Sequence, residues 1–132
     1  MAENQAQSAI NPQALEKILG ISEHAFVVEM IDIFLADGQS LVAKLEIAVA
    51  EQDWLKISQA AHGFKSISGA MGANGLSKIC SELETMAKTR TGCLSDVDLV
   101  QVRQEYELVR ESLTFYRQVY GSLAKAQPPL EP

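Results

Sequence analysis

The sequence predicts an all-α protein: an antiparallel up-down four-helix bundle with a short additional helix at its N-terminus. Apolar residues recur at intervals of three and four through four long segments, which is the period of an α-helix. No segment has the alternation of a convincing strand, and no internal repeat or low-complexity block interrupts the pattern. Because the connections between these segments are short, consecutive helices are expected to pack against each other.

The first two expected helices follow from their end residues. Asn11 is a suitable N-cap, Pro12 suits the first helical position, and Gly20 ends a short helix. Ser22 is the expected N-cap of a long second helix that ends near Glu51. The residues of this helix that we expect to face the core share helical spacing and include Phe26, Met30, Ile33, Phe34, Leu41, Leu45 and Ala48.

The middle of the chain contains a glycine within a helix and then a well-marked helix start. Gly38 costs up to about 1 kcal/mol relative to alanine in the second helix, which indicates a slight bend or a close contact. Asp53 is the expected N-cap of a third helix from Trp54 to about Met71. The apolar stripe of this helix consists of Trp54, Ile57, Ala61, Phe64, Ile67 or Ser68, and Met71.

A glycine-containing break separates the third helix from the fourth. The break covers residues 72–75, and Asn74 is the expected N-cap of a fourth helix that ends near Thr89. Cys80 lies in the apolar stripe of this helix and is expected in the core. A turn is expected at residues 91–92.

The last expected helix opens on a capping box, in which Ser95 is followed three residues later by Asp98, and it ends near Ala124. Two adjacent prolines prevent the C-terminal segment from being helical throughout. The chain is therefore expected to divide into residues 1–10, a polar N-terminal segment, residues 11–125, the helical bundle, and residues 126–132, a flexible tail.

Size and charge exclude several classes of function. The 132 residues suit one domain with a modest core, and no apolar run approaches the roughly 20 residues needed to cross a bilayer. The N-terminus lacks a secretory signal, so we expect a cytoplasmic location. A net charge of −6 argues against nucleic acid as a partner. However, residues 54–90 carry five bases and two acids, and this basic region suits a small anionic group.

Metal and haem sites are not expected. The two cysteines, Cys80 and Cys93, are too few and too far apart for a zinc knuckle or a CxxC redox pair. The two histidines, His24 and His62, lack the Glu-x-x-His pattern of a metal-binding bundle.

His62 is the candidate for chemistry on the third helix. It lies one residue, about 100° of helical rotation, from Ala61, at the border of the apolar stripe. An accessible neutral imidazole is a competent nucleophile, and Lys65 at one turn's distance could neutralise phosphoryl oxygens. Spacing alone does not separate this function from that of an ordinary surface histidine, since His-x-x-Lys occurs often by chance. The helical neighbours of His62 are small or polar: Ser58, Lys65, Ser66 and Gly69.

The longer sequence around His62 resembles a known family. Residues 60–84, AAHGFKSISGAMGANGLSKICSELE, resemble the signature of histidine-containing phosphotransfer (HPt) domains: a histidine, a lysine three residues on, small residues, a turn and an apolar helix. Residues 30–54 resemble the long second helix of that family. The resemblance covers the chain from about Asn11 to Lys88, and the last helix matches only in length and pattern.

The resemblance implies a function for several side chains. His62 would take the phosphoryl group on Nε2, and Glu84, 22 positions later, would bond the other ring nitrogen and fix the tautomer. The alternative for Glu84 is a solvated surface carboxylate. Lys65 matches the lysine of the motif, whereas Lys88 would either add positive charge or be an ordinary surface lysine.

Two small residues near His62 bear on how a partner approaches. Gly69 keeps the surface low beside the histidine. Ser66 departs from the family pattern, in which glycine is common after the lysine. Its hydroxymethyl group would either crowd the partner or donate a hydrogen bond to the phosphoryl group, which puts the rate and the choice of partner in doubt.

The resemblance implies a phosphorelay intermediate that exchanges a phosphoryl group between His62 and an aspartate of a response-regulator receiver domain. The expected partners are that receiver domain, a hybrid sensor histidine kinase, or both. No nucleotide loop or acidic metal cluster is present in the sequence, so we expect no bound cofactor, Mg²⁺ from the partner, and no autonomous kinase activity. The chain is expected to be a monomer.

Two alternatives remain open at this point. The bundle would be a non-catalytic adaptor if it docked a signalling partner without phosphorylation of His62. The sequence would also look the same if the bundle were one domain of a larger hybrid kinase.

Overall fold

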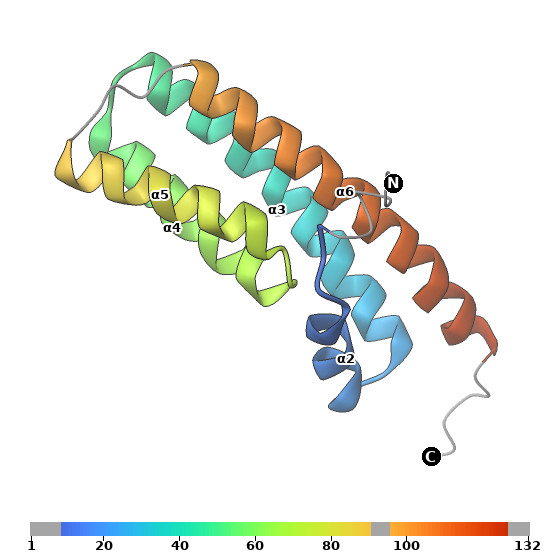
Figure 1. Ribbon diagram of the computed structural model, residues 1–132. Helices are drawn as coiled ribbons and strands as arrows, with labels where there is room; N and C mark the ends of the chain where they lie inside the picture. The colour runs from blue at the N-terminus through green and yellow to red at the C-terminus, as the bar shows by residue number, and fades with distance from the viewer. Residues whose placement is uncertain (1–8, 91–95, 127–132) are drawn as a thin grey trace, which may run out of the picture.

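The protein is described by a computed structural model over residues 9–90 and 96–126. Five helices and no strand occur in these residues (Figure 1). The helices are α2 (Pro12–Gly20), α3 (His24–Ala50), α4 (Trp54–Ala70), α5 (Asn74–Thr89) and α6 (Asp96–Ala126). The predicted all-α class is confirmed, and the helix bounds agree with the predicted ones to within about two residues.

Four of the helices enclose a single core. α3 contacts α4, α4 contacts α5, α5 contacts α6, and α6 contacts α3. In Figure 1, α4 and α5 form a hairpin against one end of the longer α3–α6 pair, and α2 lies against α3 beyond the hairpin. The arrangement is a four-helix bundle with a short additional N-terminal helix. None of the described helices is both long and apolar enough to span a membrane.

Two of the predicted helix caps are present. The Asn11 side chain accepts a hydrogen bond from the backbone N–H of Gln13 at 3.0 Å. The Asp53 carboxylate accepts one from the backbone N–H of Lys56 at 3.1 Å. Each cap satisfies a backbone donor that the first turn of a helix leaves unpaired. The Asp53 cap fixes the start of the helix that carries His62.

Two other predicted caps are wrong. The Ser22 hydroxyl donates to the Ile18 carbonyl at 2.7 Å and so closes α2, while Glu23 occupies the N-cap of α3 without a side-chain bond. Asn74 is the first residue of α5, and its N-cap is Ala73. A serine or asparagine between two helices can bond to a backbone group of either helix. The geometry of the connection decides which group the side chain reaches. The predicted capping box at Ser95, the turn at 91–92, Cys93 and the tail lie outside the described residues.

The buried face of α3 differs from the predicted one. Phe26 and Ile33 are 41% and 53% exposed, whereas Val27 and Ile31 are fully buried. Phe34, Leu45 and Ala48 are buried as predicted, and Met30 and Leu41 are partly buried. α3 has apolar residues on more than one side, and the contacts with α2, α4 and α6 select the side that is covered.

Gly38 permits a close helix contact, as the sequence suggested. A Cβ atom at Gly38 would lie 2.6 Å from Cε1 of Tyr106 on α6. The Tyr106 hydroxyl donates to the Leu35 carbonyl at 3.0 Å, which satisfies a polar group inside the α3–α6 contact. The glycine therefore lets an aromatic ring lie directly against the backbone of α3.

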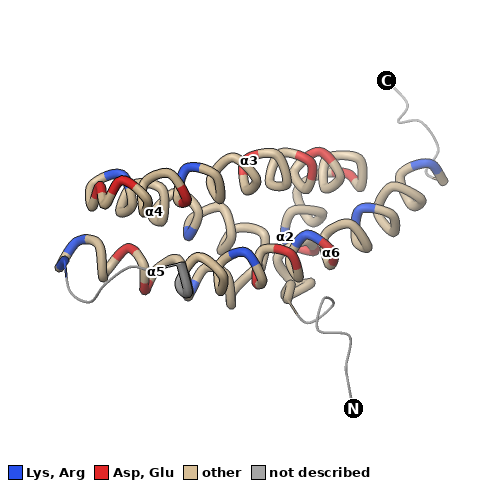
Figure 2. The backbone as a smooth tube through the Cα atoms, turned by 90° about the horizontal axis from the view of Figure 1, so that it is seen from above, with Lys and Arg blue, Asp and Glu red and all other residues tan. Residues whose placement is uncertain are grey.

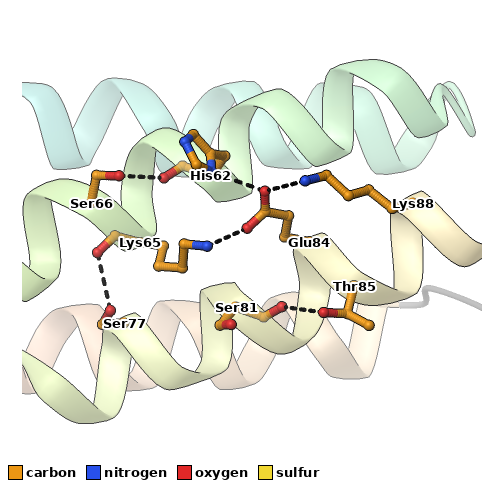
Figure 3. Close-up of polar contacts among 8 residues, drawn as sticks. All are labelled: His62, Lys65, Ser66, Ser77, Ser81, Glu84, Thr85 and Lys88. Atoms are coloured by element: carbon orange, nitrogen blue, oxygen red, sulfur yellow. Dashed lines mark hydrogen bonds and ion pairs between the residues drawn. The ribbon is translucent and has the colours of Figure 1, made fainter.

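The apolar stripe of α4 lies in the core. Ile57, Ala61, Phe64 and Ser68 are buried, and Trp54 and Ile67 pack at its edge. Cys80 of α5 is fully buried, as predicted. With these residues fixed against the core, α4 turns His62 outward and toward the edge shared with α5 (Figure 3).

Candidate functional site

The site forms where the middle of α4 faces the second half of α5. Nδ1 of His62 lies 2.9 Å from Oε2 of Glu84 (Figure 3). The His62 side chain is 61% exposed, whereas the Glu84 side chain is only 6% exposed. An exposed imidazole ring therefore contacts a buried carboxylate through Nδ1.

Glu84 has two further partners, both lysines. Nζ of Lys65 donates to Oε1 at 2.6 Å, and Nζ of Lys88 lies 2.9 Å from Oε2 (Figure 3). The hydrogen bonds from Lys65 and Lys88 lower the pKa of Glu84 to about 2, against the opposing effect of burial. The carboxylate is therefore ionised throughout the physiological pH range.

The charge of Glu84 determines the tautomer of His62. An ionised carboxylate can only accept hydrogen bonds, so the Nδ1 atom at 2.9 Å must carry the proton. In the neutral ring the lone pair then lies on Nε2, the nitrogen that does not contact Glu84. The bond to Glu84 thus selects the tautomer whose free nitrogen, Nε2, is the one away from the carboxylate.

A further hydrogen bond joins the same two helices through the backbone of α4. The Ser77 hydroxyl on α5 donates to the Lys65 carbonyl on α4 at 3.0 Å (Figure 3). This bond adds a polar contact between α5 and the histidine helix, about one turn from His62. Sequence reasoning did not identify this contact, because a serine gives no sign of which carbonyl it will reach.

The structure brings together four of the six site residues that the sequence singled out: His62, Lys65, Glu84 and Lys88. The alternative of a solvated carboxylate is wrong for Glu84, which is buried and bonded to the ring. Lys88 is exposed but contacts the carboxylate, so it is more than an isolated surface lysine.

Ser66 and Gly69 stand apart from this group. The Ser66 hydroxyl donates to the backbone carbonyl of His62 at 3.1 Å, so its proton points along its own helix. Gly69 is exposed, and a Cβ atom there would make only an ordinary contact, 3.6 Å from the Ser77 hydroxyl oxygen. A larger residue would therefore fit at position 69 within the chain itself.

Among its charged side chains, the helix that carries His62 has only positive ones, unlike the other long helices. Figure 2 shows charged residues along the helices; both signs occur on α3, α5 and α6, whereas α4 carries lysines alone. Among the described residues, no group of three or more His, Cys, Asp or Glu side chains is arranged to hold a metal ion. The described site consists of an exposed imidazole, a buried carboxylate and two ammonium groups.

A helical bundle with an accessible, carboxylate-bonded histidine has the geometry that a module carrying a group on histidine would need. Comparison with known protein families identifies the family to which this chain belongs. The family model for the Hpt domain matches residues 29–112, and the chain belongs to this family. No curated protein sequence matches the chain.

A solved structure shares the fold. The histidine-containing phosphotransfer protein B (HptB) of Pseudomonas aeruginosa PAO1 superposes with a TM-score of 0.71 at 20% sequence identity. The match covers 91% of this chain and 97% of that one. Membership of the Hpt family makes this chain a phosphotransfer module of two-component phosphorelays, a class that carries phosphoryl groups and interacts with kinases and receiver domains.

Proposed function

We propose that His62 is the residue that carries the phosphoryl group, exchanging it with the aspartate of a response-regulator receiver domain. The observation that supports this most directly is the 2.9 Å bond between Nδ1 of the exposed ring and the buried Glu84 carboxylate. It leaves Nε2 as the nucleophile and provides a negative charge beside the ring when the ring becomes positive.

The reaction is a direct displacement at phosphorus. The Nε2 lone pair forms a bond to the phosphorus of the receiver's phosphoaspartate, and the P–O bond to that aspartate breaks with its electron pair on the leaving carboxylate. The reverse step breaks the N–P bond and returns the electron pair to Nε2. Because the transition state is loose, alignment and neutralisation of charge contribute most to the rate.

The neighbouring residues have separate functions in this proposal. Lys65 donates to Oε1 of Glu84 at 2.6 Å, and its side chain is partly exposed. It therefore positions the carboxylate and adds positive charge for the phosphoryl oxygens. Ser66 contributes a hydrogen bond to the phosphoryl group only if its hydroxyl leaves the His62 carbonyl, whereas Gly69 keeps the surface low for the partner.

In this proposal the metal ion and the phosphoryl group come from the partner proteins. Mg²⁺ belongs in the acidic pocket of the receiver domain, and the donor is that receiver or a hybrid sensor histidine kinase. The chain itself has no autonomous kinase activity in this proposal. It acts as a monomer in the cytoplasm, the compartment that it must share with its partners.

A transfer assay tests the proposal. A receiver domain phosphorylated with ³²P should pass label to this protein, and the label should be lost in acid, as a phosphoramidate is. His62→Gln should abolish the transfer, while the matched control His24→Gln should retain it, since His24 lies at the start of α3. Acid-stable label, or label that survives His62→Gln, would overturn the assignment. Binding of the receiver without any label on the wild-type protein would favour the non-catalytic adaptor instead.

A further inference from the structure

Two donors share a single oxygen of Glu84. Nδ1 of His62 and Nζ of Lys88 each lie 2.9 Å from Oε2, whereas Lys65 bonds the other oxygen (Figure 3). A carboxylate oxygen that accepts from an ammonium group is a weaker acceptor for a second donor. The bond that orients the His62 ring is therefore weakened by Lys88 at the atom where it forms.

We propose that Lys88 is a positioning residue that acts on His62 through Oε2 of Glu84, and that it makes the phosphorylated histidine a better phosphoryl donor. The proposal rests on the proposed function of His62. Lys88 is one helical turn after Glu84 on α5, and its side chain is 62% exposed. Its ammonium group thus covers the buried carboxylate from the solvent side, beside the ring.

The direction of the effect follows from the charge of the ring. With phosphorus on Nε2 and a proton on Nδ1, the ring is positive, and the Glu84 anion stabilises it. Transfer breaks the N–P bond, returns the electron pair to Nε2 and leaves the ring neutral. Because Lys88 draws charge from Oε2, Glu84 stabilises the positive ring less than it would without Lys88. The equilibrium therefore shifts toward the phosphorylated receiver.

Direct contact of Lys88 with the phosphoryl oxygens would have the opposite effect. An ammonium group on those oxygens would stabilise phosphorylated His62, and its removal would favour transfer to the receiver. The two arrangements therefore differ in the sign of the effect of one substitution, Lys88→Met.

The experiment compares Lys88→Met with Lys78→Met, which removes the same charge from another face of α5, where Lys78 lies beside Glu82 and Glu105. In the unphosphorylated protein, the Nδ1–H proton of His62 should shift downfield in NMR spectra of Lys88→Met and remain in place in Lys78→Met. With a receiver, the equilibrium constant for transfer from His62 should fall about two- to fivefold, the range of a partly exposed ion pair. Lys88→Arg should restore both values.

A double-mutant cycle then tests the path through Glu84. In a Glu84→Gln background, Lys88→Met should change neither the ring spectrum nor the transfer equilibrium. An equal effect of Lys88→Met in both backgrounds would overturn the proposal, and so would a rise in the equilibrium constant for transfer. The ring spectrum requires no phosphorylation, so its outcome is separate from a failure of wild-type His62 to accept label.

Discussion

Within the described residues, acid–base pairs join helices in the α4–α5 hairpin and in the α3–α6 pair, and the two regions differ mainly in how far these pairs are exposed to water. In the α4–α5 hairpin, Glu84 is 6% exposed and its pKa is lowered to about 2 by hydrogen bonds from Lys65 and Lys88. In the α3–α6 pair, Asp32 and Arg117 form a two-bonded pair at 2.6 and 3.0 Å, but both side chains are 47% exposed. The hydrogen bonds from Arg117 lower the pKa of Asp32 as well.

The comparison shows that similar ionic contacts serve different purposes in the two regions. An exposed pair is screened by water and contributes about 0–1 kcal/mol. A buried carboxylate must keep its partners, because an unpaired charge in the interior is costly. Apolar packing holds both pairs of helices together, but the contact between α4 and α5 also contains a buried polar network that bonds the His62 ring.

The largest expected effect is a loss of stability in acid that belongs to Glu84. Its pKa is about 2 in the folded protein and about 4.5 in the unfolded chain, so its stabilising contribution is complete above pH about 4.5. That contribution, up to about 3 kcal/mol, is lost as the pH falls from about 4.5 through 2. Urea unfolding between pH 2 and 6 measures it. Glu84→Gln should lack this component and Asp32→Asn should keep it; identical pH slopes for wild type and Glu84→Gln would contradict the comparison.

The next effect concerns transfer. Glu84→Gln replaces the anion with a neutral amide, and we expect transfer between His62 and a receiver to slow about ten- to hundredfold, as for other groups that orient a reactive ring. Asp32→Asn removes a carboxylate charge of the exposed pair and should leave the transfer rate unchanged. Rapid-quench kinetics with a phosphorylated receiver measure both variants. Equal rates in Glu84→Gln and wild type would show that the ring needs no carboxylate.

The smallest of the three effects compares two glycines within helices. Gly38→Ala should destabilise the protein by about 1–2 kcal/mol, since the new Cβ atom meets the Tyr106 ring and the better helix propensity of alanine offsets only part of that cost. Gly63 on α4 has its nearest neighbour, Cδ2 of Leu41, at 4.0 Å, so Gly63→Ala should stabilise by up to about 1 kcal/mol. Thermal unfolding measures both. A stable Gly38→Ala variant would show that the α3–α6 contact tolerates a wider spacing.

The helices and the position of His62 at the edge of the core could be predicted from the amino-acid sequence alone. Helical periodicity and the Asn11 and Asp53 caps depend on contacts between residues only a few positions apart, so they are visible without a tertiary structure. His62 lies 100° from Ala61 on α4, at the border of the apolar stripe, so the sequence placed its ring within reach of the surface. Glu84 was found through resemblance to a family, because a separation of 22 residues carries no geometric information.

The buried side of α3 and the atoms that the long side chains reach depend instead on how the helices pack. α3 has apolar residues on several sides, so its rotation about its own axis depends on the helices that pack against it. The bonds from Lys65 and Lys88 to separate oxygens of Glu84 depend on the distance between α4 and α5 and on side-chain rotamers. Neither quantity follows from spacing along the chain, and together they create the shared oxygen beside His62.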